Sequence, residues 1–498
     1  MLLAAGSVGA GVAASLALAD PAAAASANGG TASSPTDTIQ LRRDTAANWT
    51  SVNPTLATGE VGLATDVQAG MLRAGPGAWN SLRSMTDNLG VYNVKHYGAK
   101  GDGTTNDAAA INAAITAANT AGGGTVFLPP GVYIVNKTIN AAGVLVKSNV
   151  RVVGSGRDAT TIRSANAQGD MHVLIVADAT NAEVRDLTVD GNRAGSGGAG
   201  GHGVSIGNSS KIRIVDVRSV NGQHYGVGMQ SGTMDDIWID GVLVEDCGGD
   251  GIDIKDWNSA NRAIRITNCV VRRFGRKGDQ SYAGIDIRGL GVNVSGCFVD
   301  QYGDLGPTLG ATGIRCRFGE SDVNSNWWGA HYSQISNCTV RAADTLATGT
   351  GIVFGFHIES RGVNLDNCVT WGAEIGFYLH QSDSHLTNCR AIDAKDVGFW
   401  LQDGTSVTAP SPADRLLVVA CSSIVRTRPD TSSIGTAHFS VESANNRFVA
   451  CGVKGTAHAS EKGLWFRSTS SGNIWRDGAI HVPAGVPTDD DGTGNTIA

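Results

Sequence analysis

The sequence predicts an all-β protein, a parallel β-helix with one capping helix near its N-terminal end and a small module before that helix. Three observations carry the prediction. A motif of glycine followed by apolar-x-apolar recurs along the chain, a second motif falls once between its successive copies, and cysteines recur within the second motif. Two alternating strand motifs, spaced about 20 to 40 residues apart, are typical of a solenoid with loops of variable length.

Residues 1–27 are predicted to be a signal-like segment that directs export. Residues 2–18 are apolar and small, and small residues suited to signal cleavage follow near Ala25 and Ala27. A transmembrane anchor is the alternative, although the stretch is short and rich in glycine. Residues 28–38 form a polar linker. We therefore expect a secreted, extracellular protein with no membrane association once the signal is removed.

A small module is predicted at residues 39–82. It reads TIQLRRDTAANWTSVNPTLATGEVGLATD, then a short gap, then GPGAWNSL. This pattern resembles the N-terminal segment of phage tail fibre and tail-spike proteins. The resemblance implies a virion tail as the alternative location, and it leaves both a monomer and a homotrimer open.

The solenoid is predicted to start at about residue 90, where VYNVKHYGAKGDGTTNDAAAINAAITAANTAGGGTVFLPPGVYIV begins at Val91. Asp107 is placed to cap a helix whose apolar face carries Ile111 and Ile115. The glycines at 122–124 end that helix. This stretch resembles the opening of the pectate-lyase-like superfamily, which includes rhamnogalacturonases and epimerase-like proteins. The resemblance implies a right-handed parallel β-helix, here spanning 90–480 with a C-terminal tail at 481–498.

The first strand motif supplies one strand to each coil. Its copies begin at Gly203, Gly226, Gly251, Gly284, Gly313, Gly351, Gly376 and Gly398. Side chains alternate along a strand, so the apolar residues of the motif point into the coil. The residues two and four places after each glycine therefore point outward.

The second motif carries the cysteines. They are Cys269, Cys297, Cys338, Cys368, Cys389, Cys421 and Cys451. Because they occupy one equivalent position and no CxxC pair exists, we expect them to stack inside the coils as free, buried thiols. Neighbouring rungs lie ~4.8 Å apart, so distance alone does not exclude disulfides. The asparagines before several of them, Asn268 and Asn337 among others, are predicted to form an internal amide ladder.

The outward positions carry an unusual group of charges. One predicted column runs Asp253, Asp286, Arg315, Val353, Tyr378 and Trp400, and the other runs Lys255, Arg288, Arg317, Gly355, His380 and Gln402. We predict Asp253, Asp286 and Arg315 as catalytic residues. The predicted substrate-binding residues are Asp250, Lys255, Asp256, Trp257, Arg288, Arg317, Trp327, Tyr378 and His380. The alternative interpretation is a structural charge ladder, and His202 is interpreted as a turn residue.

Two chemistries fit these residues. Carboxylates on adjacent rungs lie ~5 Å apart, the separation found in retaining glycosidases. Alternatively, Asp253 and Asp286 share Ca²⁺, which binds a uronate carboxylate while Arg315 or Arg317 removes a proton in β-elimination. Pectate lyases resemble this second arrangement, and the four cations favour an anionic sugar polymer.

We therefore expect an exported enzyme that cleaves an acidic, uronate-containing polysaccharide by β-elimination, with Ca²⁺ as a possible cofactor. Three hypotheses stay beside it: a glycoside hydrolase with a paired-Asp site, a phage tail-spike depolymerase or adhesin, and a polysaccharide epimerase. A polysaccharide is the expected partner. The formal net charge of −7 argues against an electrostatic nucleic-acid binder.

Overall fold

The computed structural model describes residues 41–498 apart from short internal gaps. The gaps are 67–70, 139–140, 256–261, 302–309, 322–326, 343–351, 381–382, 403–413, 427–436, 457–460 and 484. The predicted signal and linker therefore lie outside the described residues. The chain divides into two compact units, unit 1 up to Asn88 and unit 2 from Leu89 to Ala498. No helix among the described residues is both long and apolar enough to cross a bilayer.

Unit 1 is a small α/β module packed around two tryptophans. Its elements are β1 (Arg42–Asp44), α1 (Ala46–Val52), β2 (Thr55–Leu56), β3 (Val61–Ala64), β4 (Met71–Ala74), β5 (Gly77–Ala78), η2 (Trp79–Ser81) and α2 (Met85–Asn88). The buried rings of Trp49 and Trp79 stack with centroids 4.3 Å apart. The two tryptophans of the sequence pattern are therefore the core of this unit.

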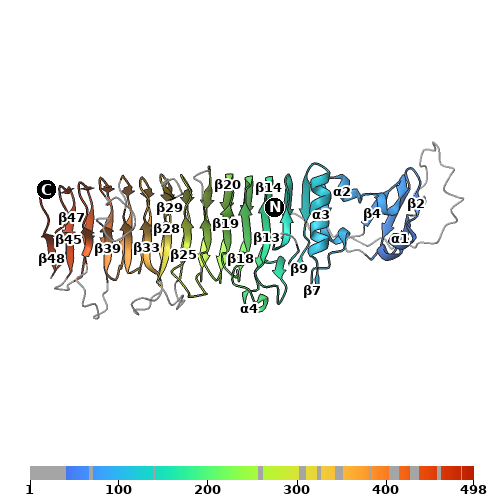
Figure 1. Cartoon of the computed structure of the whole chain (residues 1–498), viewed down its shortest axis with the longest axis horizontal. Helices are drawn as coiled ribbons and strands as arrows, with labels where there is room; N and C mark the ends of the chain where they lie inside the picture. Colours follow the sequence, from blue (N-terminus) through green and yellow to red (C-terminus); the bar gives the residue numbers. More distant parts are fainter. Residues whose placement is uncertain are drawn as a thin grey trace, which may run out of the picture. The chain divides into compact units, whose positions relative to one another are not determined.

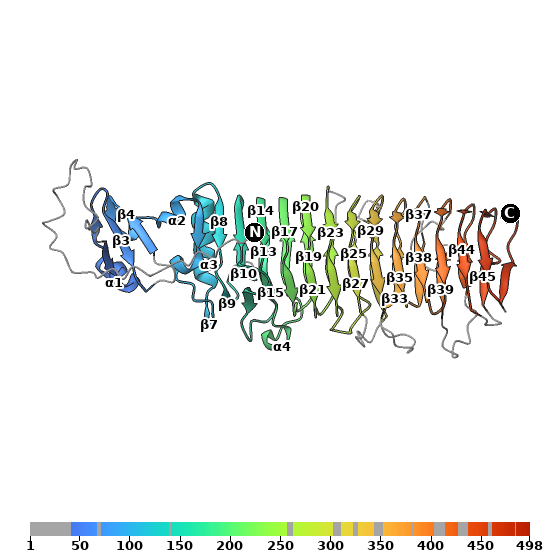
Figure 2. The same cartoon turned by 180° about the vertical axis from the view of Figure 1, so that it is seen from behind.

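Unit 2 is a right-handed parallel β-helix, as the sequence predicted (Figures 1 and 2). Each coil contributes one strand to each of three long sheets, which we call sheets 1, 2 and 3. The 13 strands of sheet 1 are β10 (Ala142–Val146), β13 (His172–Ala177), β16 (Val204–Gly207), β19 (Val227–Ser231), β22 (Ile252–Ile254), β25 (Ala283–Ile287), β28 (Ala311–Cys316), β33 (Ile352–Ile358), β36 (Ile375–Leu379), β39 (Val397–Leu401), β42 (Ala437–Val441), β45 (Lys462–Phe466) and β48 (Val486–Asp490).

Sheets 2 and 3 complete each coil. Sheet 2 contains β6 (Val91–Asn93), β8 (Gly124–Phe127), β11 (Val150–Val153), β14 (Thr180–Arg185), β17 (Ser210–Val215), β20 (Asp235–Asp240), β23 (Arg265–Thr267), β26 (Asn293–Ser295), β31 (Gln334–Ser336), β34 (Asn364–Asp366), β37 (His385–Thr387), β40 (Leu417–Val419), β43 (Arg447–Val449), β46 (Ile474–Arg476) and β49 (Thr496–Ile497). Sheet 3 contains β7 (Asp102–Asn106), β9 (Gly131–Val135), β12 (Thr160–Ser164), β15 (Thr188–Asp190), β18 (Arg218–Val220), β21 (Leu243–Glu245), β24 (Val270–Arg272), β27 (Phe298–Asp300), β32 (Thr339–Arg341), β35 (Val369–Trp371), β38 (Arg390–Ile392), β41 (Ser422–Ile424), β44 (Gly452–Lys454) and β47 (Ala479–His481).

The N-terminal end of the β-helix is covered by η3 (Val94–Tyr97) and α3 (Ala108–Thr120), as Figure 1 shows for α3. The predicted apolar face of α3 is confirmed, because Ile111 and Ile115 are fully buried. Asp107 occupies the N-cap position, but its side chain does not cap the helix. Its carboxylate instead accepts hydrogen bonds from the backbone N–H groups of Lys100 and Gly101, at 2.6 and 2.9 Å.

Equivalent side chains stack on one another inside the β-helix. All nine cysteines are buried and free, which confirms the predicted thiol column. Four phenylalanines of sheet 1 form a second internal stack, with successive ring centroids 4.6 to 4.9 Å apart. They are Phe356, Phe377, Phe399 and Phe439. Neighbouring coils therefore contact one another in the core through side chains of the same type.

Two predictions about the coils need correction. The asparagines that precede the cysteines are exposed rather than internal, although the predicted amide ladder is present between Asn367 and Asn337, where the Asn367 amide donates to the Asn337 side-chain oxygen at 2.8 Å. Asn268, Asn337 and Asn367 adopt φ values of 51 to 54°. They serve a turn that needs the left-handed conformation, which asparagine tolerates better than most residues. Residues 481–498 are not a tail either, since β48 and β49 pair with the preceding coil.

We predict that truncating one ring of the phenylalanine stack destabilises the β-helix. Phe399→Ala removes a fully buried ring that contacts two others, so the free energy of unfolding should fall by about 3–5 kcal/mol. Trp371→Ala is the matched control, because that ring is 44% exposed and its loss should cost less than about 1 kcal/mol. Urea unfolding followed by circular dichroism measures both, and equal losses would contradict the internal stack.

Candidate active site

The predicted acid column exists on sheet 1. Asp253 lies in β22, Asp286 in β25 and Arg315 in β28, and these residues pair directly in register. The isoleucines on either side of Asp253 belong to the hydrophobic core. Because side chains alternate along a strand, the Asp253 and Asp286 carboxylates lie on the outer side of the coil. The sequence therefore identified the right strands and the right face.

The column continues differently from the prediction beyond Arg315. The structure pairs Arg315 with His357, not with Val353, and the pairing of β28 with β33 shifts register at Ala311 and Thr312. The segment Gly351-Ile-Val-Phe has the residue pattern of the strand motif. In the structure, however, the apolar residues of Gly355-Phe-His-Ile are the ones that lie in register with those of the preceding coil. The column then runs through Tyr378 and Trp400, as predicted.

The carboxylates are not open to solvent, which corrects the expectation of an exposed acidic pair. Asp253 and Asp286 are fully buried, and Arg315 is only 5% exposed. A buried carboxylate needs compensating charge or hydrogen bonds. The side chains of Lys255 and Arg288 supply part of that compensation and keep more exposure, at 15% and 21%.

Asp286 is the centre of the ion network. Its carboxylate receives two hydrogen bonds from Arg315, at 3.0 and 2.9 Å, and two from Arg288, at 3.3 and 2.8 Å. Arg317 lies 3.9 Å away. Burial would raise the pKa of Asp286, but the three guanidiniums lower it below its ordinary value. Arg315 is therefore a paired, buried cation with a raised pKa rather than an available base.

Asp253 and Asp250 complete the cluster. Asp253 lies 3.4 Å from the Lys255 ammonium and 3.8 Å from Arg288. Asp250 accepts a hydrogen bond from the backbone N–H of Ala283 at 2.5 Å. Burial, together with the charges of Asp286 and Asp253, raises the pKa of Asp250 to about 8. Asp250 is therefore held mainly in its neutral form at pH 7.

The three carboxyl groups are close enough to suggest a metal site, with oxygens within 4.8 Å of one another. The surrounding charges do not fit Ca²⁺. Both oxygens of Asp286 are already bonded to guanidinium groups, and Ca²⁺ requires six to eight oxygen ligands. The Arg288 guanidinium also lies within 4 Å of both the Asp253 and the Asp286 carboxylates, where its positive charge would repel a metal ion. We therefore derive no step through a metal.

A tyrosine that the sequence analysis did not select lies against this cluster. The Lys255 ammonium donates a hydrogen bond to the Tyr225 hydroxyl at 3.2 Å and lies 4.9 Å from the centre of its ring. Burial and the nearby Asp253 and Asp250 raise the pKa of Tyr225, so its phenol stays protonated. The only sequence signal was its position just before a strand of sheet 1, next to His224 and one coil after His202.

Histidines stack beside this tyrosine. The rings of His202 and His224 lie 4.8 and 3.8 Å from the Tyr225 ring. Burial lowers the pKa of His224 to about 4 and also lowers that of His202 well below its ordinary value, so both are neutral at pH 7. The Nδ1 atom of His202 accepts the backbone N–H of Tyr225 at 3.4 Å. His202 is therefore a buried coil-to-coil contact.

The C-terminal part of the column is aromatic. Tyr378 packs 4.8 Å from Trp400, and the Nε2 atoms of His357 and His380 are 3.0 Å apart. Burial lowers the pKa of His380 to about 4. The predicted binding residues Asp256 and Trp257 lie outside the described residues. Trp327 belongs to β30 (Trp327–Gly329), which pairs with β29 (Phe318–Ser321), and its side chain also lies outside the description.

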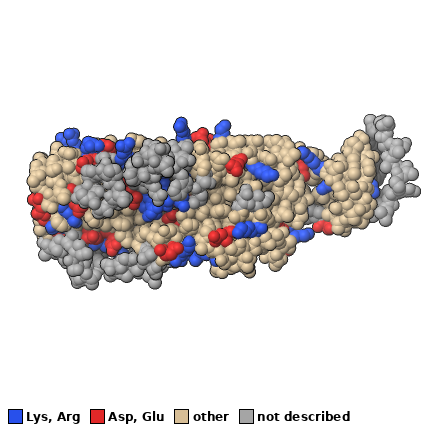
Figure 3. Space-filling view, in the orientation of Figure 1, with Lys and Arg blue, Asp and Glu red and all other residues tan. Residues whose placement is uncertain are grey.

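The surface charge of unit 2 is mixed rather than uniform. On the face drawn in Figure 3, Lys and Arg side chains alternate with Asp and Glu among the described residues. A local cluster such as that around Asp286, rather than a broad charged surface, is therefore the feature that can select an anion.

Comparison with known proteins supports the interpretation of both units. Residues 91–299 match the model of the family described as rhamnogalacturonase A/epimerase, pectate lyase-like. Residues 39–69 match the major tropism determinant N-terminal domain.

Curated relatives match parts of the chain. Alginate lyase 7 of Azotobacter vinelandii is 44% identical over 109 residues, which is 20% of this chain and 13% of that protein. Mannuronan C5-epimerase AlgE4 of the same organism is 35% identical over 181 residues, 32% of this chain and 31% of that protein. The pre-neck appendage protein of Bacillus phage B103 is 30% identical over 203 residues, 35% of this chain and 22% of that protein. The matches thus span less than a third of each of these relatives.

A solved structure supports the fold alone. The pre-mature gene product 12 of bacteriophage phi29 is 17% identical, with a TM-score of 0.51 over 83% of this chain and 52% of that chain. The chain therefore combines a right-handed parallel β-helix, whose residues 91–299 match the rhamnogalacturonase A/epimerase, pectate lyase-like family model, with a preceding segment that matches the N-terminal domain of the major tropism determinant.

Proposed function

We propose that this chain acts on a uronate-containing polysaccharide on the outer side of sheet 1, removing the proton beside the sugar carboxylate. The observation that carries the proposal is an excess of cations at the site. Lys255, Arg288, Arg315 and Arg317 surround three carboxyl groups, and one of these, Asp250, is mainly neutral at pH 7. A ligand carboxylate would balance the remaining positive charge.

Arg288 and Arg317 are the residues proposed to receive the sugar carboxylate. Their side chains are 21% and 36% exposed, whereas the side chain of Arg315 is only 6% exposed. A guanidinium binds a carboxylate through two parallel hydrogen bonds. Neutralising that carboxylate makes the adjacent C5 proton more acidic, which is the barrier common to elimination and epimerisation.

Tyr225 and His224 are the groups proposed to move protons. His224 is uncharged at pH 7, and its Nε2 is buried with no hydrogen-bond partner among the described residues. Acceptance of the C5 proton by this atom therefore requires the ring to turn toward the substrate. The Tyr225 phenol keeps its proton and can give it to the glycosidic oxygen as the C4–O bond breaks and a C4–C5 double bond forms. Lys255 then stabilises the phenolate at 3.2 Å. Returning a proton to C5 instead would give the epimer.

The names of the relatives support this choice of chemistry. One is an alginate lyase and others are mannuronan C5-epimerases, and both names refer to uronate polymers. We favour elimination, with epimerisation as the alternative outcome at the same residues. A hydrolase has one specific observation in its favour, the separation of the pKa values of Asp250 and Asp286, which is typical of acid and base pairs. The pairing of Asp286 with Arg315 argues against a free nucleophile there.

A second proposal concerns location. The match of residues 39–69 to the major tropism determinant N-terminal domain, together with the phage appendage relative, favours a virion tail component over a secreted enzyme. A depolymerase on a tail would use unit 1 for attachment and sheet 1 for its polymer. Export remains the competing proposal.

We predict that Tyr225→Phe lowers kcat/KM on polymannuronate by about 10²- to 10⁴-fold, because it removes the proposed acid. Arg288→Gln should raise KM more than it lowers kcat. Arg341→Gln is the matched control, since Arg341 pairs with Asp300 on sheet 3 at 2.7 Å, away from the site.

The assay follows absorbance near 235 nm, reducing ends and the uronate composition of the polymer by NMR. Absorbance with reducing ends indicates elimination, and a changed composition without shortening indicates epimerisation. Reducing ends without absorbance indicate hydrolysis and would contradict the proton-abstraction mechanism. Full activity of both site variants would contradict the assignment of the residues.

We predict a pH-dependent contribution of Asp250 to stability. Its pKa is about 8 in the folded chain and near 4 when unfolded, so the folded state binds more protons between these values. The stabilisation is complete below about pH 4 and is lost as the pH rises through 8. Relative to Asp250→Asn, which retains an oxygen for the Ala283 N–H, the wild type should lose free energy of unfolding across this range. A constant difference between pH 4 and 9 would show that Asp250 is not held neutral.

We predict that the full chain forms a homotrimer if it is a tail component. Sedimentation equilibrium measures this directly, and a chain lacking residues 1–88 is the control for the contribution of unit 1. A monomer at micromolar concentration would favour the secreted enzyme.

A further inference from the structure

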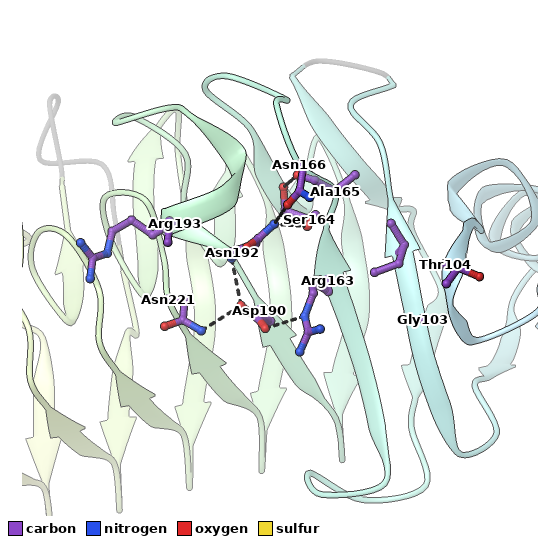
Figure 4. A pocket seen from close by; sticks show the side chains of 12 residues that line it. Gly103, Thr104, Arg163, Ser164, Ala165, Asn166, Asp190, Asn192, Arg193 and Asn221 are labelled. Carbon is purple, nitrogen blue, oxygen red and sulfur yellow. Dashed lines mark hydrogen bonds and ion pairs between the residues drawn. The ribbon is translucent and has the colours of Figure 1, made fainter.

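A separate cavity lies on another side of the β-helix. It has a volume of about 610 Å³ and is walled by β12, β15, the turn after β18 and the short helix α4 (Arg193–Ser196), with Thr104 of β7 at one end (Figure 4). Its strands belong to sheet 3, whereas the cluster around Asp286 lies on sheet 1. The coil that includes β13 to β15 precedes β22 by three steps along sheet 1.

One wall of the cavity is held in place by Asp190. Its Oδ2 accepts a hydrogen bond from Arg163 Nε at 2.7 Å, and its Oδ1 accepts the backbone N–H of Asn192 at 2.9 Å and the Nδ2 of Asn221 at 3.1 Å. Figure 4 shows these three residues converging on the carboxylate. Both oxygens of Asp190 are therefore engaged, so the residue orients hydrogen-bond donors rather than presenting a free negative charge.

The turn above this wall is also organised in advance. Asn192 has φ 46°, in the left-handed region, and its side-chain amide donates to the Ser164 carbonyl at 3.0 Å and to Asn166 at 2.9 Å. This conformation directs the chain into α4 and brings Arg193 to the edge of the cavity. A site that is formed before the ligand binds avoids part of the entropic cost of binding.

The cavity favours an anion. Arg163 uses Nε for Asp190 and its side chain remains 44% exposed, which leaves its terminal nitrogens for a ligand. The Nε of Arg193 is buried and has no hydrogen-bond partner among the described residues. Two guanidiniums thus line a cavity whose carboxylate, Asp190, is already neutralised by one of them. In Figure 4 the two arginines lie on opposite sides of the Asp190–Asn221 pair, with the guanidinium of Arg193 directed away from Asp190.

The rest of the lining favours a ligand rich in hydroxyl groups. Apart from Ile134, its members are amide, hydroxyl and small side chains, with no aromatic ring, histidine or lysine among the described lining residues. A volume of about 610 Å³ lies within the range of small-ligand sites. We propose that this cavity is a second, non-catalytic binding site for a short segment of an anionic oligosaccharide. The choice of uronate as the anion rests on the proposed function.

Such a site would hold the polymer at a distance from sheet 1. Its expected effect is on the retention of long chains rather than on the chemical step, because no proton-exchange group lines it. Two sites joined by one polymer raise the effective concentration at the second site. Short oligomers cannot gain from this effect, so chain length separates the two sites experimentally.

Isothermal titration of the full chain with tetramannuronate tests the proposal. We expect two binding sites in the wild type and one in the double variant Arg163→Gln/Arg193→Gln. Ala194→Trp should cause the same loss by filling the cavity without changing its charge, which covers the case in which loss of the Arg163–Asp190 pair disturbs the fold. Arg151→Gln is the matched control, as Arg151 is a 51% exposed arginine paired with Glu183 on sheet 2.

The same variants should keep the wild-type kcat on tetramannuronate and show an increase of at least threefold in KM on the long polymer. Two sites persisting in both cavity variants would overturn the proposal. Equal displacement by inorganic phosphate at the same concentration would also overturn it, since that result indicates a general anion site. If Arg288→Gln leaves catalysis intact while the cavity variants lose one site, the proposed function fails and the binding site stands.

Discussion

The parallel register of successive coils is the constraint on which the structure depends. Parallel strands in register place each side chain directly against its equivalent in the next coil, about 4.8 Å away. Inside the coils this stacks cysteine on cysteine and phenylalanine on phenylalanine, with ring spacings of 4.6 to 4.9 Å. Apolar stacking of this kind is favourable without any further partner.

On the outer face of the coils, the same register brings two negatively charged side chains together. It places Asp253 directly beside Asp286, and both are fully buried. Two adjacent buried carboxylates destabilise one another unless cations compensate. Arg315 and Arg288 neutralise Asp286, Lys255 approaches Asp253, and Asp250 retains its proton. The cations needed for this compensation leave an excess of positive charge, and the proposed binding of an anionic sugar rests on that excess.

Sequence periodicity was sufficient for the fold and for the location of the cluster. The alternation of two motifs identified the strands of sheet 1, so Asp253, Asp286 and Arg315 could be placed on one face before any coordinates were known. Periodicity failed at β33, where both Gly351 and Gly355 begin a sequence that fits the motif. Only the packing in the structure shows that Phe356 and Ile358 are the residues that point into the core. Periodicity also missed β48 and β49, whose mostly exposed residues lack the apolar strand motif.

Burial and proton affinity were beyond the reach of periodicity. The pattern could not show that Arg315 donates two hydrogen bonds to the Asp286 carboxylate, or that Lys255 contacts Tyr225. These contacts shift the proposed catalytic roles from Asp and Arg to Tyr225 and His224. The most direct test of this account is a crystal structure of the chain with a bound oligomannuronate. The account predicts a sugar carboxylate within hydrogen-bond distance of Arg288 or Arg317, with Tyr225 near the glycosidic oxygen, and an oligomer absent from sheet 1 would contradict it.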